Sequence, residues 1–334
     1  MPDDKSPIAV LGAGSWGTAL ALVFARSGRV VRLWGRDEKQ LAGMAAGRTN
    51  DRYLPGIDFP DNLHIEADLE ACVRGANDIL ISVPSHGLRE TLTKVAPLLE
   101  DGARICWATK GFELSTGKLP HQVAEEILGD NHPVAVLSGP TFATEVGEGL
   151  PTAMTIAANE PDFAGELATT LSGDKFRAYT SEDMIGVEVG GAVKNVLAIG
   201  AGLSDGLGFG ANTRIALINR GLVEMTRLGV ALGAKNDTFM GLAGMGDLVL
   251  TCTDNQSRNR RMGLLLASGK TVDEAQEEIQ QVVEGVLAAK AVRDVAESLH
   301  VTMPICGEIY RILYEGVPPR EAVGALMGRA LKPE

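Results

Sequence analysis

The chain has 334 residues, of which 45% are hydrophobic and 22% are charged, and its formal net charge is −12. This composition is that of a globular chain with room for one or two domains and a substantial core. The acidic balance, with no long basic run, argues against a nucleic-acid partner. The cysteines have no CxxC spacing, and the histidines form no metal-ligand pattern. We therefore expect reduced thiols, a cytoplasmic location and no metal site.

An uncharged stretch over residues 6–25 superficially resembles a signal peptide or a membrane span. The residues before it, Met1-Pro2-Asp3-Asp4-Lys5, are acidic, whereas a secretory signal begins with basic residues. The stretch also contains three glycines in the spacing of a phosphate-binding loop. We expect neither export nor membrane insertion.

The first motif is a glycine-rich turn between two apolar runs. Residues 8–11 predict a strand, residues 18–26 a helix and residues 30–34 a second strand, with the turn Gly12-Ala13-Gly14-Ser15-Trp16-Gly17 after the first strand. A G-x-G-x-x-G pattern alone is weak, but between a strand and a helix it strongly favours a dinucleotide-binding fold.

Each glycine of this turn has an expected role. Gly12 permits the tight turn, Gly14 lets the backbone approach a pyrophosphate, and Gly17 lets the helix pack on the strand. The backbone N–H groups of Ser15 and Trp16 would donate to the phosphates at the helix N-terminus. The alternative is a tight glycine turn that binds nothing.

The end of the second strand bears on the choice of cofactor. NAD-preferring sites carry Asp or Glu there, on the ribose 2′-hydroxyl, but this chain reads Gly35-Arg36-Asp37. A guanidinium at Arg36 suits a 2′-phosphate, so the sequence favours NADPH over NADH, with Asp37 as the counter-argument. The alternative for Arg36 is a solvated strand-end arginine.

Strand and helix patterns then alternate, which predicts a mostly parallel sheet with helices on both faces, a Rossmann-type α/β domain. The further predicted strands are 78–83, 104–108, 134–137, 152–157 and 176–179. Ligands of such sheets bind beyond the carboxyl ends of the strands. Lys110 and the loop 139–143 fall at those ends, although Lys110 alone could equally be a surface lysine.

The run from Gly186 to Ser204 predicts a helix that is apolar nearly all round and therefore buried. Lys194 lies in it among apolar residues, one turn after Gly190. Glycines inside a helix cost about 1 kcal/mol each relative to alanine, so something must approach Gly190 and Gly191 closely. We interpret that something as a flat ligand at which Lys194 points. The alternative is a lysine whose stem is buried while its ammonium reaches water.

After residue 185 only helical periods remain. The sequence therefore predicts a dinucleotide-binding domain over 1–189 and an all-helical domain over 190–334.

Two polar clusters stand out in the second half. Asp247 lies in the glycine-rich turn 243–248, and the segment 253–261 places three arginines in four residues at a helix start. Cations are disfavoured there unless an anion is present too, so the segment predicts a phosphate site. For Arg260 and Arg261 a solvated basic face is a serious alternative. Glu284 could be an ordinary first-turn acid.

Together these blocks resemble the NAD(P)-dependent glycerol-3-phosphate dehydrogenase family in its bacterial biosynthetic form, along 8–330. The most specific motifs are Ser138-Gly139-Pro140-Thr141-Phe142-Ala143, Gly191-Ala192-Val193-Lys194-Asn195 and Thr253 through Arg261, joined by Ala108-Thr109-Lys110-Gly111 and the glycine turn. The resemblance implies reversible reduction of dihydroxyacetone phosphate to sn-glycerol 3-phosphate with NADPH or NADH, for phospholipid synthesis in the cytoplasm.

The resemblance also implies the site residues. Lys194 would be the catalytic acid and base, and Arg258 with the N–H groups of Ser257 and Asn259 would hold the phosphate. The implied substrate contacts are Lys110, Gly139, Thr141, Lys194, Asp247, Ser257, Arg258 and Asn259. The implied cofactor contacts are Ser15, Trp16, Arg36, Lys110, Ala143, Arg258, Val282 and Glu284.

Two other functions remain open on the residues alone. One is a two-domain β-hydroxyacid-type dehydrogenase, which would also use a helix lysine but has no need of a phosphate site. The other is a nicotinamide-binding sensor without chemistry, which would have no need of a buried proton donor. A homodimer is expected only because two-fold dimers are common.

Overall fold

The computed structural model describes residues 6–330, which form two compact units. Among the described residues, unit 1 comprises 6–110 and 120–184, and unit 2 comprises 111–119 and 185–330. This division differs from the predicted 1–189 and 190–334. Helix α8 (Met184–Gly206) belongs to unit 2 almost from its first residue, and Phe112 and Leu119 are buried in the apolar core of that unit.

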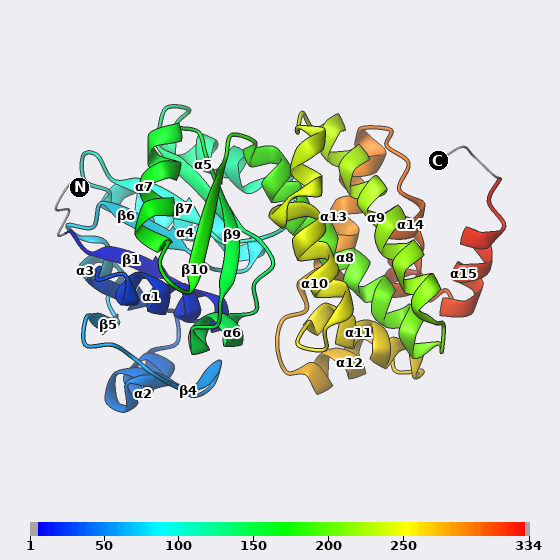
Figure 1. Cartoon of the computed structure of the whole chain (residues 1–334), viewed down its shortest axis with the longest axis horizontal. Coiled ribbons are helices and arrows are strands. Elements are labelled where there is room, and N and C mark those ends of the chain that lie inside the picture. The colour runs from blue at the N-terminus through cyan, green and yellow to red at the C-terminus, as the bar shows by residue number, and fades with distance from the viewer. Residues whose placement is uncertain (1–5, 331–334) are drawn as a thin grey trace. The chain divides into compact units, whose positions relative to one another are not determined.

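Unit 1 is built on an eight-stranded sheet with the order β10-β9-β8-β7-β6-β1-β2-β5 (Figure 1). Its strands are β1 (Ile8–Leu11), β2 (Val31–Trp34), β5 (Leu63–Glu66), β6 (Asp78–Ile81), β7 (Arg104–Trp107), β8 (Val134–Ser138), β9 (Thr152–Ala158) and β10 (Phe176–Ser181). Neighbouring strands are parallel except β8 and β9. The predicted mostly parallel Rossmann-type sheet is confirmed.

The helices of unit 1 fall into two groups by their mutual contacts, as expected for layers on opposite faces of a sheet. One group is α1 (Ser15–Arg26), α6 (Ala143–Glu148) and α7 (Pro161–Leu171), and the other is α3 (Leu69–Val73), α4 (Leu88–Val95) and α5 (Pro120–Leu128). Between β2 and β5 lie α2 (Glu38–Gly47) and a small hairpin of β3 (Thr49–Asn50) and β4 (Leu54–Asp58), which the sequence did not predict.

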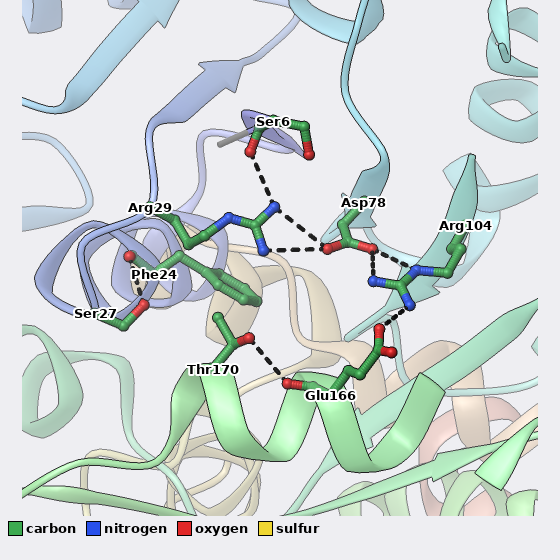
Figure 2. A network of polar contacts seen from close by, with 8 residues as sticks. All are labelled: Ser6, Phe24, Ser27, Arg29, Asp78, Arg104, Glu166 and Thr170. Atoms are coloured by element: carbon green, nitrogen blue, oxygen red, sulfur yellow. Dashed lines mark hydrogen bonds and ion pairs between the residues drawn. The ribbon is translucent and has the colours of Figure 1, made fainter. Parts of the chain in front are cut away.

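A polar network lies at the amino-terminal ends of the central strands of this sheet (Figure 2). Asp78, the first residue of β6, is 1% exposed and forms ion pairs with Arg29 at 3.4 Å and Arg104 at 2.7 Å. Arg104 also pairs with Glu166 on α7, and Arg29 donates to the Ser6 carbonyl oxygen. Because the charges at this edge neutralise one another, it has a structural role, and ligand chemistry is expected at the carboxyl edge.

The described residues of unit 2 form helices, turns and loops without a strand, which confirms the predicted all-α second half. Its helices are α8 (Met184–Gly206), α9 (Ala211–Ala231), α10 (Asp247–Thr253), α11 (Arg258–Ala267), α12 (Val272–Ile279), α13 (Glu284–Ser298), α14 (Pro304–Tyr314) and α15 (Pro319–Met327). A 3-10 turn, η3 (Asn236–Met240), and a π-type turn, η4 (Leu242–Gly246), precede α10.

Helix α8 is the centre of unit 2 because its glycines admit other backbones. A Cβ at Gly190 would lie 2.3 Å from the Ala243 carbonyl oxygen of η4, and one at Gly202 would lie 2.0 Å from that of Arg260 on α11. The helix is long and apolar enough to cross a membrane, but 89% of its most apolar window is buried inside the protein. Its hydrophobicity is therefore that of a core helix.

Glu224 on α9 ties the start of α14 to the same core. It is 3% exposed and accepts hydrogen bonds from the backbone N–H groups of Ile305, at 2.8 Å, and Cys306, at 3.1 Å. Burial raises the pKa of this carboxyl above its ordinary value, although the two N–H donors act in the opposite direction. The folded state therefore binds this proton more tightly than the unfolded chain does.

This raised pKa predicts a pH-dependent stability. The Glu224 contribution is fully present below the unfolded pKa and is lost as pH rises through the higher folded pKa. The urea midpoint of the wild type should therefore fall relative to that of Glu224→Gln as pH rises above the ordinary carboxyl pKa of 4.5. Parallel midpoint curves for the two proteins would show that Glu224 does not titrate differently on folding.

Candidate active site

The glycine loop joins β1 to α1, and the protein's own backbone requires two of its glycines. Gly12 has φ +127°, and a Cβ there would lie 2.3 Å from the Ser82 carbonyl oxygen after β6. A Cβ at Gly17 would lie 1.9 Å from the Gly12 carbonyl oxygen. At Gly14, by contrast, no described atom lies within 4 Å of such a Cβ. Gly14 therefore leaves open space next to the backbone, as a bound pyrophosphate requires.

The loop presents unpaired donors. Gly14 is the N-cap of α1 and makes no side-chain cap bond, so the N–H groups of Ser15 and Trp16 have no partner within the helix. Among the described residues, the Trp16 side-chain Nε1 is also buried without a hydrogen-bond partner. From α2 and β3, Gln40 Nε2 and Asn50 Nδ2 hold the loop by donating to the Ala13 carbonyl oxygen at 2.7 and 3.1 Å. This rigid row of donors suits an anionic dinucleotide.

Arg36 and Asp37 have different surroundings in the structure. Asp37 is the N-cap of α2, accepting from Gln40 N at 3.1 Å, and its other carboxylate oxygen pairs with Arg52 at 3.2 Å. Its carboxylate is thus engaged in capping. Arg36 lies exposed just after β2. The guanidinium is therefore the better candidate for contact with the ribose end of a cofactor.

Lys110 and the segment 139–143 follow the carboxyl ends of the neighbouring strands β7 and β8. Lys110 is half-buried. A Cβ at Gly139 would lie 2.9 Å from the Met154 Cα, so this turn needs glycine, and Thr141 Oγ1 donates to the Gly139 carbonyl oxygen at 3.2 Å. Ala143 begins α6. The structure thus brings these residues to the same edge of the sheet as the glycine loop.

In unit 2, Lys194 points inward from α8 to a carboxylate. Its side chain is 8% exposed, and Nζ lies 2.5 Å from Oδ1 of Asp247, which is 1% exposed. Nζ also lies 3.1 Å from Thr251 Oγ1, and that hydroxyl donates to the Asp247 carbonyl oxygen at 2.6 Å. The ammonium is therefore held in a fixed orientation, and the alternative of a lysine that reaches bulk water is ruled out.

The glycine argument for this helix needs a correction. We interpreted Gly190 as the seat of a flat ligand, but the group that approaches it is the chain's own η4 turn, through the Ala243 carbonyl oxygen. The close approach places Asp247, the first residue of α10, beside Lys194. Gly190 thus supports the site indirectly, because a side chain there would displace the turn that carries the carboxylate.

The first turn of α11 contains three of the predicted site residues. Ser257 is its N-cap, with its side chain accepting from Arg260 N at 3.2 Å. Arg258 Nη1 donates to the Val282 carbonyl oxygen at 2.9 Å, which joins two residues predicted separately as cofactor contacts. The half-buried Glu284 begins α13 and accepts from Asn195 Nδ2 at 3.4 Å.

The N–H groups available at the predicted phosphate site differ from those expected. The Ser257 N–H donates to the Asp254 carbonyl oxygen at 3.2 Å, so the unpaired helix-start donors are the N–H groups of Arg258 and Asn259. The Asn259 side chain donates to Asn195 Oδ1 at 2.9 Å and accepts from Gly285 N at 2.8 Å. Its amide therefore joins α11 to α8 and α13, and its backbone N–H is the donor of Asn259 that has no partner within the helix.

Two features near the site are not predicted by the sequence: the contact of Thr251 with Lys194 and the burial of Arg260. Thr251 lies four residues after Asp247, so the helical period could have placed both on one face, but a lone threonine gives no signal of its own. Arg260 is 8% exposed and ion-paired with Asp205, so the solvated-face alternative is wrong for it. Among the described residues no group of three or more His, Cys, Asp or Glu side chains is placed to hold a metal.

Unit 1 thus combines a Rossmann-type sheet with an open glycine loop, and unit 2 holds a buried lysine–carboxylate pair. These features define a nicotinamide-dinucleotide-dependent oxidoreductase.

Comparison with known proteins specifies the family. Residues 7–164 match the model of the NAD-dependent glycerol-3-phosphate dehydrogenase N-terminus, and residues 183–324 match that of the C-terminus. The chain belongs to the NAD-dependent glycerol-3-phosphate dehydrogenase family.

Individual relatives agree over the full length. A glycerol-3-phosphate dehydrogenase [NAD(P)+] of Klebsiella pneumoniae is 56% identical over 331 residues, 99% of this chain and 98% of that protein. The crystal structure of glycerol-3-phosphate dehydrogenase from Coxiella burnetii is 50% identical with a TM-score of 0.95, covering 97% of this chain and 99% of that one. The enzyme from Saccharomyces cerevisiae is 27% identical with a TM-score of 0.84, covering 96% and 99%.

Proposed function

We propose that the protein catalyses the reversible NAD(P)H-dependent reduction of dihydroxyacetone phosphate to sn-glycerol 3-phosphate in the cytoplasm, as a source of glycerol phosphate for phospholipids. The observation that carries the chemical part of this proposal is the buried Lys194–Asp247 pair. A protein that only sensed a nicotinamide nucleotide would have no use for a proton donor held in this way.

The glycine loop is the proposed cofactor site. Gly12, Gly14 and Gly17 shape the loop, which has open space beside Gly14, and the N–H groups of Ser15 and Trp16 are the proposed phosphate donors. Arg36, Lys110, Ala143, Arg258, Val282 and Glu284 are the further proposed contacts. A bound nicotinamide nucleotide supplies the hydride that reduces the substrate carbonyl.

Lys194 is the proposed proton donor. When the C2 carbonyl carbon gains hydride, its oxygen gains an electron pair and must take up a proton. The Lys194 ammonium stabilises that negative charge and gives up one proton from Nζ, and in the reverse direction the amine removes it. Asp247 and Thr251 orient Nζ, at 2.5 and 3.1 Å. No metal takes part in this scheme.

Binding of the substrate phosphate is assigned to the start of α11. The Arg258 guanidinium and the N–H groups of Arg258 and Asn259 are donors suited to a dianion. Ser257 shapes this turn, and Lys110, Gly139, Thr141 and Asp247 are the further proposed substrate contacts. Binding of the phosphate, which is remote from the reacting carbon, holds the carbonyl in position for reaction.

One assay separates the candidate functions. Loss of NADPH absorbance is measured with dihydroxyacetone phosphate, and gain of absorbance is measured with 2- and 3-hydroxy acids and NADP+. The proposal predicts turnover with dihydroxyacetone phosphate and sn-glycerol 3-phosphate as the product. Turnover of hydroxy acids alone would support a β-hydroxyacid dehydrogenase, and binding of NADPH without any turnover would support a sensor.

Arg36 predicts the cofactor preference. In Arg36→Ala, kcat/KM with NADPH should fall about 10- to 100-fold, because hydrogen bonds to a charged group contribute about 1.5–3 kcal/mol, while kcat/KM with NADH stays nearly constant. The control is Lys39→Ala, an exposed cation three residues further along. Equal losses with both cofactors would remove Arg36 from 2′-phosphate recognition.

A further inference from the structure

Arg260 is a buried cation for which the proposed chemistry gives no direct use. It lies in the first turn of α11, 8% exposed, two residues after Arg258. Each of its guanidinium nitrogens donates to a different segment. Nε reaches the Cys252 carbonyl oxygen at 3.1 Å, Nη1 reaches Asn255 Oδ1 at 2.6 Å, and Nη2 reaches Asp205 Oδ2 at 2.5 Å.

Those three segments are the ones that carry the proposed chemistry. Cys252 lies on α10, the helix that begins with Asp247. Asn255 lies in the turn that leads into α11 and its unpaired N–H groups. Asp205 lies in the last turn of α8, the helix that carries Lys194. A planar guanidinium fixes direction as well as distance, so one side chain sets the relative positions of all three.

Backbone contacts make this arrangement tight. A Cβ at Gly202 on α8 would lie 2.0 Å from the Arg260 carbonyl oxygen, and one at Gly263 on α11 would lie 2.0 Å from that of Ile199. Helices α8 and α11 therefore touch backbone to backbone at Arg260 and again one turn later, at Gly263. A change in the Arg260 side chain cannot be absorbed by sliding the helices, and would shift the turn at 254–257 instead.

The charges of the network favour an anion nearby. Asp205 is an acid at the C-terminal end of α8, where the helix dipole disfavours it, and it is neutralised by Arg260 and by Arg214 at 2.8 Å. Two guanidinium groups thus share one carboxylate at the start of α11. Asp205 supplies one anion for two cations, so the network keeps a net positive charge that a bound phosphate would offset.

We propose that Arg260 is a positioning residue for the reaction: it holds the phosphate-binding turn before α11 in register with Lys194 on α8 and Asp247 on α10. This inference rests on the proposed function, because it concerns how binding of the substrate phosphate places the substrate carbonyl next to Lys194. A purely structural role would lower stability without changing how much the phosphate contributes to catalysis.

The test compares dihydroxyacetone phosphate with dihydroxyacetone, which has the same carbonyl but no phosphate. Arg260→Lys keeps the charge beside Asp205 but offers one nitrogen in place of three. Its kcat/KM for dihydroxyacetone phosphate should fall about 10²-fold, the effect of a misplacement near 1 Å, while that for dihydroxyacetone changes little. Asn255→Ala removes only the Nη1 acceptor from an exposed residue, so it should fold normally and show a smaller loss of the same selectivity.

Ile309→Val, a core change in unit 2 at a residue 3% exposed, is the control for lost stability and should leave the ratio of the two kcat/KM values unchanged. If folded Arg260→Lys and Asn255→Ala both keep the wild-type ratio, the positioning role is refuted. A wild type that reduces dihydroxyacetone but gains nothing from the phosphate would instead refute the proposed phosphate seat, and a wild type that reduces neither would refute the proposed function.

Discussion

Replacing Lys194 with alanine is expected to lower kcat by about 10²–10⁴-fold, the usual effect of losing a general acid or base. The lost group is the amine that lies 2.5 Å from Asp247 and 3.1 Å from Thr251. Cofactor affinity should change little, because the glycine loop in unit 1 does not include this residue. Steady-state kinetics with dihydroxyacetone phosphate and a fluorescence titration with NADPH measure the two quantities.

The matched control is Lys290→Ala. Lys290 is an exposed lysine on a helix of the same unit and pairs with Asp294 four residues further on. Its loss should leave kcat at the wild-type value, since exposed ion pairs contribute little. An alanine variant at Lys194 with a turnover similar to that of the Lys290 control would exclude Lys194 as the proton donor.

Asp247→Ala is expected to destabilise unit 2 by about 3–5 kcal/mol, the range seen when one partner of a buried ion pair is removed. The reason is the burial of both side chains, at 8% and 1% exposure, which leaves the Lys194 ammonium in a poorly solvated site without this carboxylate. The shift of the urea midpoint measures the loss. Asp237→Ala, an exposed acid in η3, should stay within about 0.5 kcal/mol of the wild type.

A double variant separates charge from packing in this prediction. Lys194→Met together with Asp247→Leu removes both charges and keeps apolar volume, so it should recover most of the stability lost in Asp247→Ala. Its kcat should nevertheless be as low as that of Lys194→Ala, because the Lys194 amine is missing in both. If the double variant is as unstable as Asp247→Ala, burial of an unpaired charge is not the cause of the loss.

The sequence predicts the elements whose signal is local. The strand, glycine turn and helix predicted over 8–26 are confirmed as β1, the glycine loop and α1. Their signal is local because the backbone next to Gly12 and Gly17 leaves no room for a side chain. The long apolar helix around Lys194 is confirmed as α8. The hairpin of β3 and β4 was not predicted, since a two-residue strand such as Thr49–Asn50 has no periodicity to read.

The partners of these elements were harder to predict. A glycine inside a helix signals a close approach, but the sequence does not say whether a ligand or another backbone approaches, and at Gly190 it is the η4 turn. The sequence predicts β9 (Thr152–Ala158) as one more strand of the alternating pattern, but β9 runs antiparallel to β8. Strand direction depends on how the preceding connection crosses the sheet, which the strand's own residues do not show.

The partners of charged residues are equally hard to predict from the sequence. Arg258, Arg260 and Arg261 form one basic cluster in the sequence, yet Arg260 is buried against Asp205 and Arg258 reaches the Val282 carbonyl oxygen. The helical period separates their faces, but their partners lie on helices distant in the chain. Roles within such a cluster are therefore set by tertiary packing, which a single sequence does not encode locally.

The central claim is that Lys194 supplies the proton that accompanies hydride transfer, and a single-turnover experiment tests it most directly. Enzyme in excess, loaded with NADPH, is mixed with dihydroxyacetone phosphate, and loss of nicotinamide absorbance reports the chemical step without product release. We predict that this step is about 10²–10⁴-fold slower in folded Lys194→Ala than in the wild type. Equal single-turnover rates in the two proteins would contradict the proposed mechanism.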